Sequence, residues 1–243
     1  MEVYFIQGVI LPERADFDLS WSTKGMHLAS GNVYSANVSI MYNQVAIWLE
    51  SENEINADNM KHVVDYLIIN QVAAVSYLAG CVYDFQVTRV INRARNIDYV
   101  VGVDTSVIFD RRNLESFDHD LGVIRRLQAG IHGTFIHRCL ADLVSAMRYR
   151  EDTSFYCYRA IEALRNHCAE VNGIGNEMKD RGMRWEKFRE VTGVSEERIG
   201  WVAEFAKNAR HGGVAMLSAD EYGRLLNETW DIVSVYFKSA SSI

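Results

Sequence analysis

The sequence predicts an α+β protein, with a β-rich N-terminal domain that carries one long helix and an all-α C-terminal helical bundle. Short β-branched apolar runs separated by turn residues fill the first part of the chain. From residue 121 onward, apolar residues instead recur at helical spacing. The polar string DRRNLESFDHD, residues 110–120, separates the two patterns. We therefore predict one domain over residues 1–110 and a helical domain over residues 111–243.

Four strands in a meander are the simplest account of the first part of the chain. Turn or breaker residues separate the apolar runs, at Pro12, at Gly31 with Asn32, and at Asn43 with Gln44. The predicted strands cover residues 2–11, 17–28, 33–41 and 45–49.

One long helix should follow these strands. Asn56 and Asp58 are residue types that cap helices, and an apolar stripe at helical spacing begins at Met60 and ends at Gly80. Strand character then returns over residues 82–91 and 97–109. The helix would lie on one face of the resulting sheet.

We predict that the second half of the chain forms a bundle of four main helices and one short helix. The first is a long helix from Leu121 to Met147, in which Gly130 and Gly133 allow close helix contact or a slight bend. The second covers residues 153–170. Its predicted buried seam consists of Cys157, Ile161, Leu164 and Cys168.

Capping residues define the remaining helices. A short helix around Trp185 ends at Gly193, and Ser195 is placed to cap the next helix. Ser218 with Glu221 has the spacing of a capping box at the start of the final helix.

The composition predicts an ordered, soluble and cytoplasmic protein. Hydrophobic residues make up 49% of the chain, which is enough for a substantial core. There is no run of about 18 apolar residues, so we expect no membrane association. The N-terminal sequence MEVYFIQGVILPER lacks the basic start and small-residue cleavage site of a signal peptide.

The sequence offers no pattern for a metal or cofactor. Cys81, Cys139, Cys157 and Cys168 show no CxxC spacing, and we expect buried thiols. We find no glycine-rich phosphate loop, dinucleotide fingerprint, zinc spacing or nucleophile elbow. We therefore expect no cofactor.

Charge is unevenly distributed along the chain. Residues 1–110 contain 6 basic and 13 acidic residues, whereas residues 111–243 contain 19 of each. A nucleic-acid-binding protein usually has a positive electrostatic field over its surface. Any RNA would therefore have to bind a local basic patch in the second half of the chain. The acidic first half of the chain suits a basic protein partner better than it suits RNA.

A polar cluster marks the end of an amphipathic helix in the stretch WVAEFAKNARHGG, which ends at Gly213. Lys207 and Asn208 lie four and three residues before His211, so all three side chains share one helix face. Gly212 and Gly213 then end the helix. Cations at a helix C-terminus also offset the macrodipole, by about 0.3–1 kcal/mol each, which is a purely structural explanation.

The second half resembles HEPN domains, helical bundles found in toxins, abortive-infection proteins and other RNA-targeting defence systems. The resemblance covers roughly residues 115–240. The resemblance depends on three segments, which are YRAIE at 158–162, NARHG at 208–212, and the amphipathic final helix. The resemblance implies a bundle that forms a homodimer and joins two copies of an arginine and histidine motif into a metal-independent ribonuclease site.

The resemblance also implies roles for individual side chains. His211 would be the acid/base, because an imidazole titrates near neutrality and can move the proton of a ribose 2′-hydroxyl. Arg210 or Lys207 would stabilise the charge of the phosphorane. Asn208 would position the phosphate or fix the imidazole.

Arg159 and Glu162 would orient these groups from the second helix. The family's motif has an arginine and a histidine with four to six residues between them, often with asparagine directly after the arginine. Here Lys207 precedes Asn208, only three residues separate it from His211, and lysine lacks the bidentate fork of arginine.

Two functional hypotheses follow from these features. The first is a HEPN-type ribonuclease or RNA-binding effector that its N-terminal domain controls. The second is a catalytically inactive HEPN-like scaffold or adaptor that binds a protein or nucleotide ligand. Both include a protein partner at the acidic N-terminal domain and a homodimer through the bundle.

Overall fold

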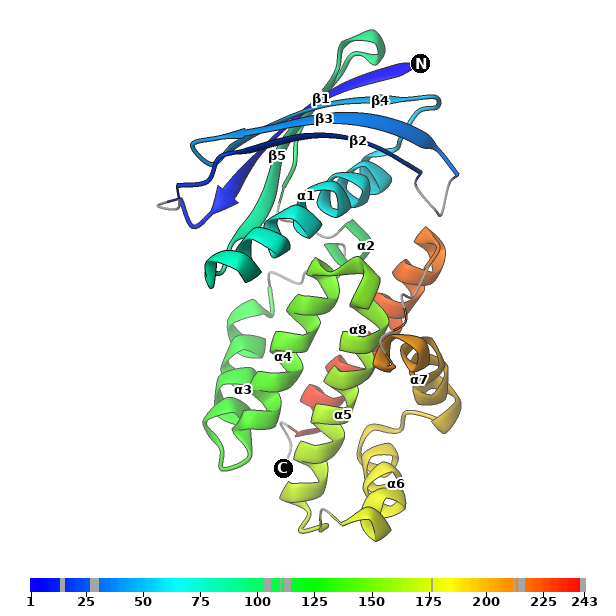
Figure 1. Cartoon of the computed structure of the whole chain (residues 1–243). Coiled ribbons are helices and arrows are strands. Elements are labelled where there is room, and N and C mark those ends of the chain that lie inside the picture. The colour runs from blue at the N-terminus through cyan, green and yellow to red at the C-terminus, as the bar shows by residue number, and fades with distance from the viewer. Residues whose placement is uncertain are drawn as a thin grey trace. The chain divides into compact units, whose positions relative to one another are not determined.

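A computed structural model confirms the α+β class (Figure 1). The structure describes residues 1–13, 16–26, 31–102, 106–109, 111, 115–175, 177–211, 213 and 217–240. The chain forms two compact units, Met1–Val103 and Asp104–Ile243.

The first unit contains an antiparallel sheet of six strands in the order β2-β3-β4-β1-β5-β6. The strands are β1 (Glu2–Leu11), β2 (Leu19–Met26), β3 (Val33–Met41), β4 (Gln44–Ser51), β5 (Asp84–Asn92) and β6 (Ile97–Val100). The four predicted strands form, but the predicted meander is wrong for β1, because β1 pairs with β4 and β5 and only β2, β3 and β4 are successive neighbours. Residues 27 and 28 of the second predicted strand lie outside the described residues.

Helix α1 (Ala57–Ala79) packs on this sheet and confirms the predicted long helix. The Asn56 side chain accepts a hydrogen bond from the backbone N–H of Asn59 at 2.8 Å, and Gly80 ends the helix at a φ of 63°. Met60 and Ile68 are fully buried in the core of the unit. By length and composition alone, residues Asn59–Ala79 could cross a membrane; 28% of this stretch is buried in the structure, and a single such helix is weak evidence for a membrane span.

Of the strand predicted over residues 97–109, residues 97–100 form β6, residues 103–105 lie outside the described residues, and the prediction is wrong for residues 106–109. Ser106–Phe109 forms a short helix, α2, whose Val107 and Ile108 pack against the core of the second unit. The two units therefore divide after Val103, earlier than the boundary predicted after residue 110.

The second unit is a helical bundle. Its longer helices are α3 (Phe117–Ala129), α4 (Gly133–Arg148), α5 (Thr153–Val171), α6 (Arg181–Thr192), α7 (Glu196–Arg210) and α8 (Ala219–Ala240). The predicted caps are confirmed, because the Ser195 side chain accepts from Arg198 N–H and the Ser218 side chain accepts from Glu221 N–H.

The single helix predicted from Leu121 to Met147 is wrong, because the chain turns between α3 and α4. A Cβ atom on Gly133 would lie 1.9 Å from the carbonyl oxygen of Gln128, so the turn requires glycine there. The apolar spacing continues through the turn, and it therefore hides the break.

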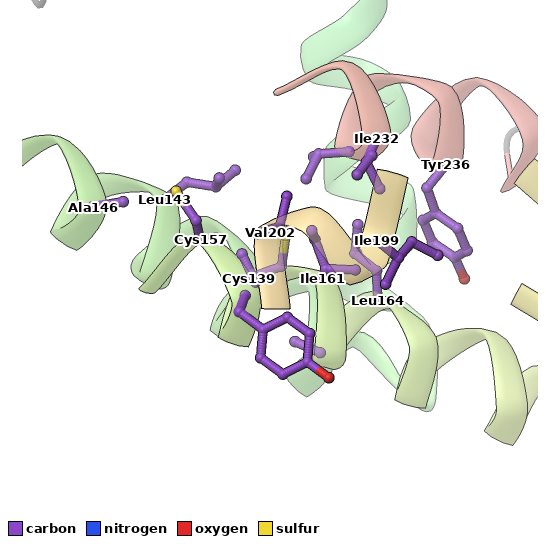
Figure 2. Packing of buried hydrophobic residues seen from close by; sticks show 14 of the residues in the cluster. Cys139, Leu143, Ala146, Cys157, Ile161, Leu164, Ile199, Val202, Ile232 and Tyr236 are labelled. Atoms are coloured by element: carbon purple, nitrogen blue, oxygen red, sulfur yellow. The ribbon is translucent and has the colours of Figure 1, made fainter. Parts of the chain in front are cut away.

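Helix α5 is the centre of the bundle, in contact with α4, α6, α7 and α8 (Figure 1). The predicted seam is confirmed, since its members Cys157, Ile161, Leu164 and Cys168 are all at most 1% exposed. Figure 2 shows Ile161 and Leu164 among buried side chains from the neighbouring helices. Burial raises the pKa of Cys157 to about 12 and that of Cys168 to about 11, so both thiols stay protonated. Cys81 is exposed, contrary to the expectation of buried thiols.

His167 of α5 is also buried, and its Nδ1 lies 2.6 Å from the hydroxyl oxygen of Tyr236 in α8. Burial lowers the pKa of His167 below its ordinary value of 6.5, and the nearby His132 contributes to the decrease. The folded state therefore favours the neutral imidazole.

We predict that the bundle loses stability as the pH falls below about 6.5, because the unfolded chain then binds a proton that folded His167 resists. The free energy of unfolding, measured by chemical denaturation between about pH 7 and pH 5, should fall more steeply for the native chain than for His167→Gln. Parallel pH profiles would exclude His167 as the source of the acid sensitivity.

Candidate functional site

The predicted polar cluster lies on the last turn of α7. Ile199, Val202 and Ala206 are buried, which fixes the rotation of the helix. Lys207, Asn208, Arg210 and His211 are all exposed. The Lys207 ammonium lies 3.8 Å from the carboxylate of Glu204, one turn earlier on the same helix.

The backbone closes α7 directly after this cluster. The Asn208 carbonyl oxygen accepts the N–H of His211 at 3.1 Å and that of Gly213 at 2.9 Å. A Cβ atom on Gly213 would approach this oxygen to 3.1 Å, so glycine suits the close turn. Gly212, predicted to help end the helix, lies outside the described residues.

Arg210 connects the end of α7 to α5. Its guanidinium carbon lies 5.2 Å from the centroid of the Tyr158 ring, a cation–π distance. Tyr158 is only 5% exposed, and the Arg210 side chain is one of the groups that cover its ring.

Glu162 and Arg165 continue the polar surface along α5. Tyr158, Glu162 and Arg165 have the 0, 4, 7 spacing of one helix face. An Arg165 nitrogen lies 3.7 Å from the Glu162 carboxylate. Burial raises the pKa of the Tyr158 phenol, and Glu162 adds to the increase. Three guanidinium groups act in the opposite direction, from Arg210, Arg165 and Arg181.

Helix α6 contacts the same face of α5 as Arg210 does. The Trp185 ring stacks against Tyr158, with centroids 6.3 Å apart, and the Arg165 guanidinium carbon lies 4.7 Å from the Trp185 centroid. Buried Arg184 donates to the Gly175 carbonyl at 2.6 Å and to the Asn166 side-chain oxygen at 3.1 Å. These contacts hold α6 against α5.

Sequence reasoning missed Arg165, Arg181 and Trp185 as members of this site. The spacing of Arg165 from Tyr158 and Glu162 was a usable signal, because it places all three on one face. Trp185 and Arg181 come from another helix, and only the packing of α6 on α5 brings them here.

Arg159 makes different contacts from those expected. Its guanidinium forms a bidentate pair with Asp142 of α4, in which Nε donates to Oδ2 at 3.1 Å. The same group lies 4.9 Å from the Phe155 ring centroid and 5.5 Å from that of Tyr156. Arg159 therefore ties α5 to α4, whereas Glu162 faces the Tyr158 side.

The cluster around Tyr158 combines groups that suit an anionic ligand. Guanidinium groups bind phosphate and stabilise developing negative charge, and the Glu162 carboxylate can orient them. His211, a residue type that can move protons, follows Arg210 at the exposed end of α7. Within the described part of the chain, no group of three or more His, Cys, Asp or Glu residues could hold a metal ion.

Fold and site together define a two-unit protein whose helical unit carries an arginine-rich, aromatic-lined polar site. Residues 4–101 match the N-terminal domain, and residues 121–241 the C-terminal domain, of a family described as domain of unknown function DUF8168. The two matches together cover most of the chain, which therefore belongs to the DUF8168 family. Comparisons with curated proteins and with solved structures found no match.

The Arg159–Asp142 pair predicts an asymmetric response to substitution. The Asp142 side chain is 3% exposed and that of Arg159 is 31% exposed. Among the residues that the structure describes, Arg159→Ala would leave the buried carboxylate with Arg138, at 4.0 Å, as its one cationic neighbour, and should cost about 3 kcal/mol of unfolding free energy. Asp142→Asn keeps one acceptor and leaves an arginine that water can reach, so it should cost about 1 kcal/mol.

Chemical denaturation of both variants measures this difference. An unchanged unfolding free energy in Arg159→Ala would show that the pair does not hold α5 to α4.

Proposed function

We propose that this protein is a HEPN-type effector of a cytoplasmic defence or toxin-type system, which cleaves RNA without a metal ion under the control of its N-terminal unit. One observation carries the proposal. The two segments that resemble HEPN domains, YRAIE on α5 and NARHG at the end of α7, contact each other through Arg210 and Tyr158.

The proposed reaction is transesterification within the RNA strand. The ribose 2′-oxygen attacks the adjacent phosphorus, and the bond from phosphorus to the 5′-oxygen of the next nucleotide breaks. His211 takes the 2′ proton or donates a proton to the leaving oxygen. Arg210 stabilises the charge on the phosphorane oxygens. The products are a 2′,3′-cyclic phosphate and a 5′-hydroxyl end.

A homodimer through the bundle suits this chemistry. One group must accept the 2′ proton while another donates a proton to the leaving oxygen. A two-fold partner would supply a second copy of His211, so that each of the two histidines takes one role. Glu162 would act at the edge of this site by orienting the cations beside Tyr158.

The N-terminal unit is proposed to recruit or regulate through a basic protein partner. Three exposed carboxylates lie at alternate positions around the end of β4, from Glu50 and Glu52 and from Glu54, which pairs with Arg95 at 3.1 Å. Such a surface repels RNA and attracts basic protein segments.

The alternative function is that of an inactive HEPN-like scaffold or adaptor for a protein or nucleotide ligand. Lys207 favours it, because its side chain is 67% exposed and lies near Glu204 on its own helix. The cation that stands before Asn208 thus contacts a carboxylate of α7, whereas Arg210 contacts Tyr158 of α5.

Cleavage of single-stranded RNA in the presence of EDTA tests the proposal. The native chain should release fragments with 2′,3′-cyclic phosphate ends. His211→Ala should lower the rate by about 100-fold or more, because it removes the acid/base. Arg210→Ala should lower it by about 100-fold, because it removes charge stabilisation.

Lys61→Ala serves as the matched control, since it removes an exposed cation from the other unit. Its rate should equal that of the native chain. Cleavage that survives His211→Ala would remove that residue from the mechanism. Intact RNA after incubation with the native chain would favour the inactive scaffold.

A further inference from the structure

We propose that single-stranded RNA extends from the end of α7 along α5 to a second anchor where α4 meets α5. This anchor, the α4–α5 arginine–aromatic cluster, consists of Arg138, Arg148, Tyr149, Phe155, Tyr156 and Arg159. The inference rests on the proposed function, because it says where the RNA lies beyond the reacting phosphate.

Contacts between side chains make this cluster continuous. The Arg159 guanidinium stacks on Phe155 and Tyr156. The Tyr156 ring centroid lies 6.1 Å from that of Tyr149, and the Arg148 guanidinium carbon lies 5.5 Å from the Tyr149 centroid. These contacts therefore run from Arg148 at the end of α4, through the two tyrosine rings, to Arg159 in the second turn of α5.

The charge of the cluster suits a polyanion. Arg138 and Arg159 face the buried carboxylate of Asp142, and Arg148 lies over the Tyr149 ring. Two exposed carboxylates, Glu151 and Asp152, lie directly before α5, and Asp152 acts on Tyr156, whose pKa is raised chiefly by burial. The Arg138 side chain is 64% exposed, so its positive charge remains available to a ligand in water. Arg138 thus supplies local positive charge in a half of the chain with no net charge.

The residue types favour single-stranded nucleic acid over other partners. Guanidinium groups bind phosphate bidentately, and aromatic rings and stacked guanidinium planes accept unpaired bases. A second copy of the chain would bring the same three arginines to face each other across a two-fold axis, which like-charge repulsion opposes. An acidic protein would satisfy the arginines but would leave the rings unused.

The cluster is continuous with the candidate site. Phe155, Arg159 and Glu162 are partly exposed positions on one stripe of α5, and Arg165 follows on the same helix. Phe155 and Arg165 are about 15 Å apart along the helix, at 1.5 Å per residue. A strand of several nucleotides can reach both of these positions.

RNA binding by the full chain tests the inference. The chain carries His211→Ala to prevent cleavage, and the probe is a fluorescent single-stranded RNA of about 15 nucleotides. Adding Arg138→Gln and Arg148→Gln should raise the Kd roughly fivefold per lost phosphate contact at about 0.1 M salt. The slope of log Kd against log salt should fall by about 0.7 for each contact.

The control pair is Lys24→Gln with Lys61→Gln, two exposed lysines of the other unit that change the net charge equally. These substitutions should leave the Kd and the salt slope unchanged. Circular dichroism checks that both double variants remain folded.

The outcomes separate this inference from the proposed function. RNA binding with the same Kd in both double variants would overturn the second anchor and leave the proposed cleavage site intact. Polyglutamate that binds as tightly as RNA would overturn the assignment to nucleic acid. A chain that neither binds nor cleaves RNA would overturn both proposals.

Discussion

The burial of α5 is the constraint on which the candidate site depends. Its seam of Cys157, Ile161, Leu164 and Cys168 is enclosed by the surrounding helices, and this fixes the rotation of the helix. A rotation of one residue would bury charged groups at a cost that no partner offsets. The seam therefore determines which polar side chains of α5 reach the surface and which helix each one meets.

Two polar contacts show how this constraint divides the helix. Arg159 turns toward α4, where Asp142 neutralises it, and Tyr158 turns toward α7, where Arg210 covers its ring. Adjacent residues thus serve different neighbours, because successive positions on a helix point about 100° apart. The arginine near Asp142 links α5 to α4 and also belongs to the α4–α5 arginine–aromatic cluster, whereas the arginine near Tyr158 lies at the exposed end of α7.

Local chemistry explains what could be predicted from the sequence. The caps at Asn56, Ser195 and Ser218 depend on side chains within three residues, and the structure confirms them. The break between α3 and α4 depends on the approach of Gly133 to Gln128, which apolar spacing does not encode. The Arg159–Asp142 pair joins two helices, and Trp185 arrives from a third, so only the packed bundle defines these contacts.

The proposed function requires that the end of α7 and the Tyr158 face of α5 form one phosphate-binding site. Nuclear magnetic resonance of the histidine side chains, during titration with a nucleoside 2′,3′-cyclic phosphate, can detect such a site. We expect a saturable shift of the His211 imidazole signals that Arg210→Ala weakens, with the His119 signals unchanged. Unchanged His211 signals at saturating nucleotide, or an equal shift in Arg210→Ala, would contradict the claim.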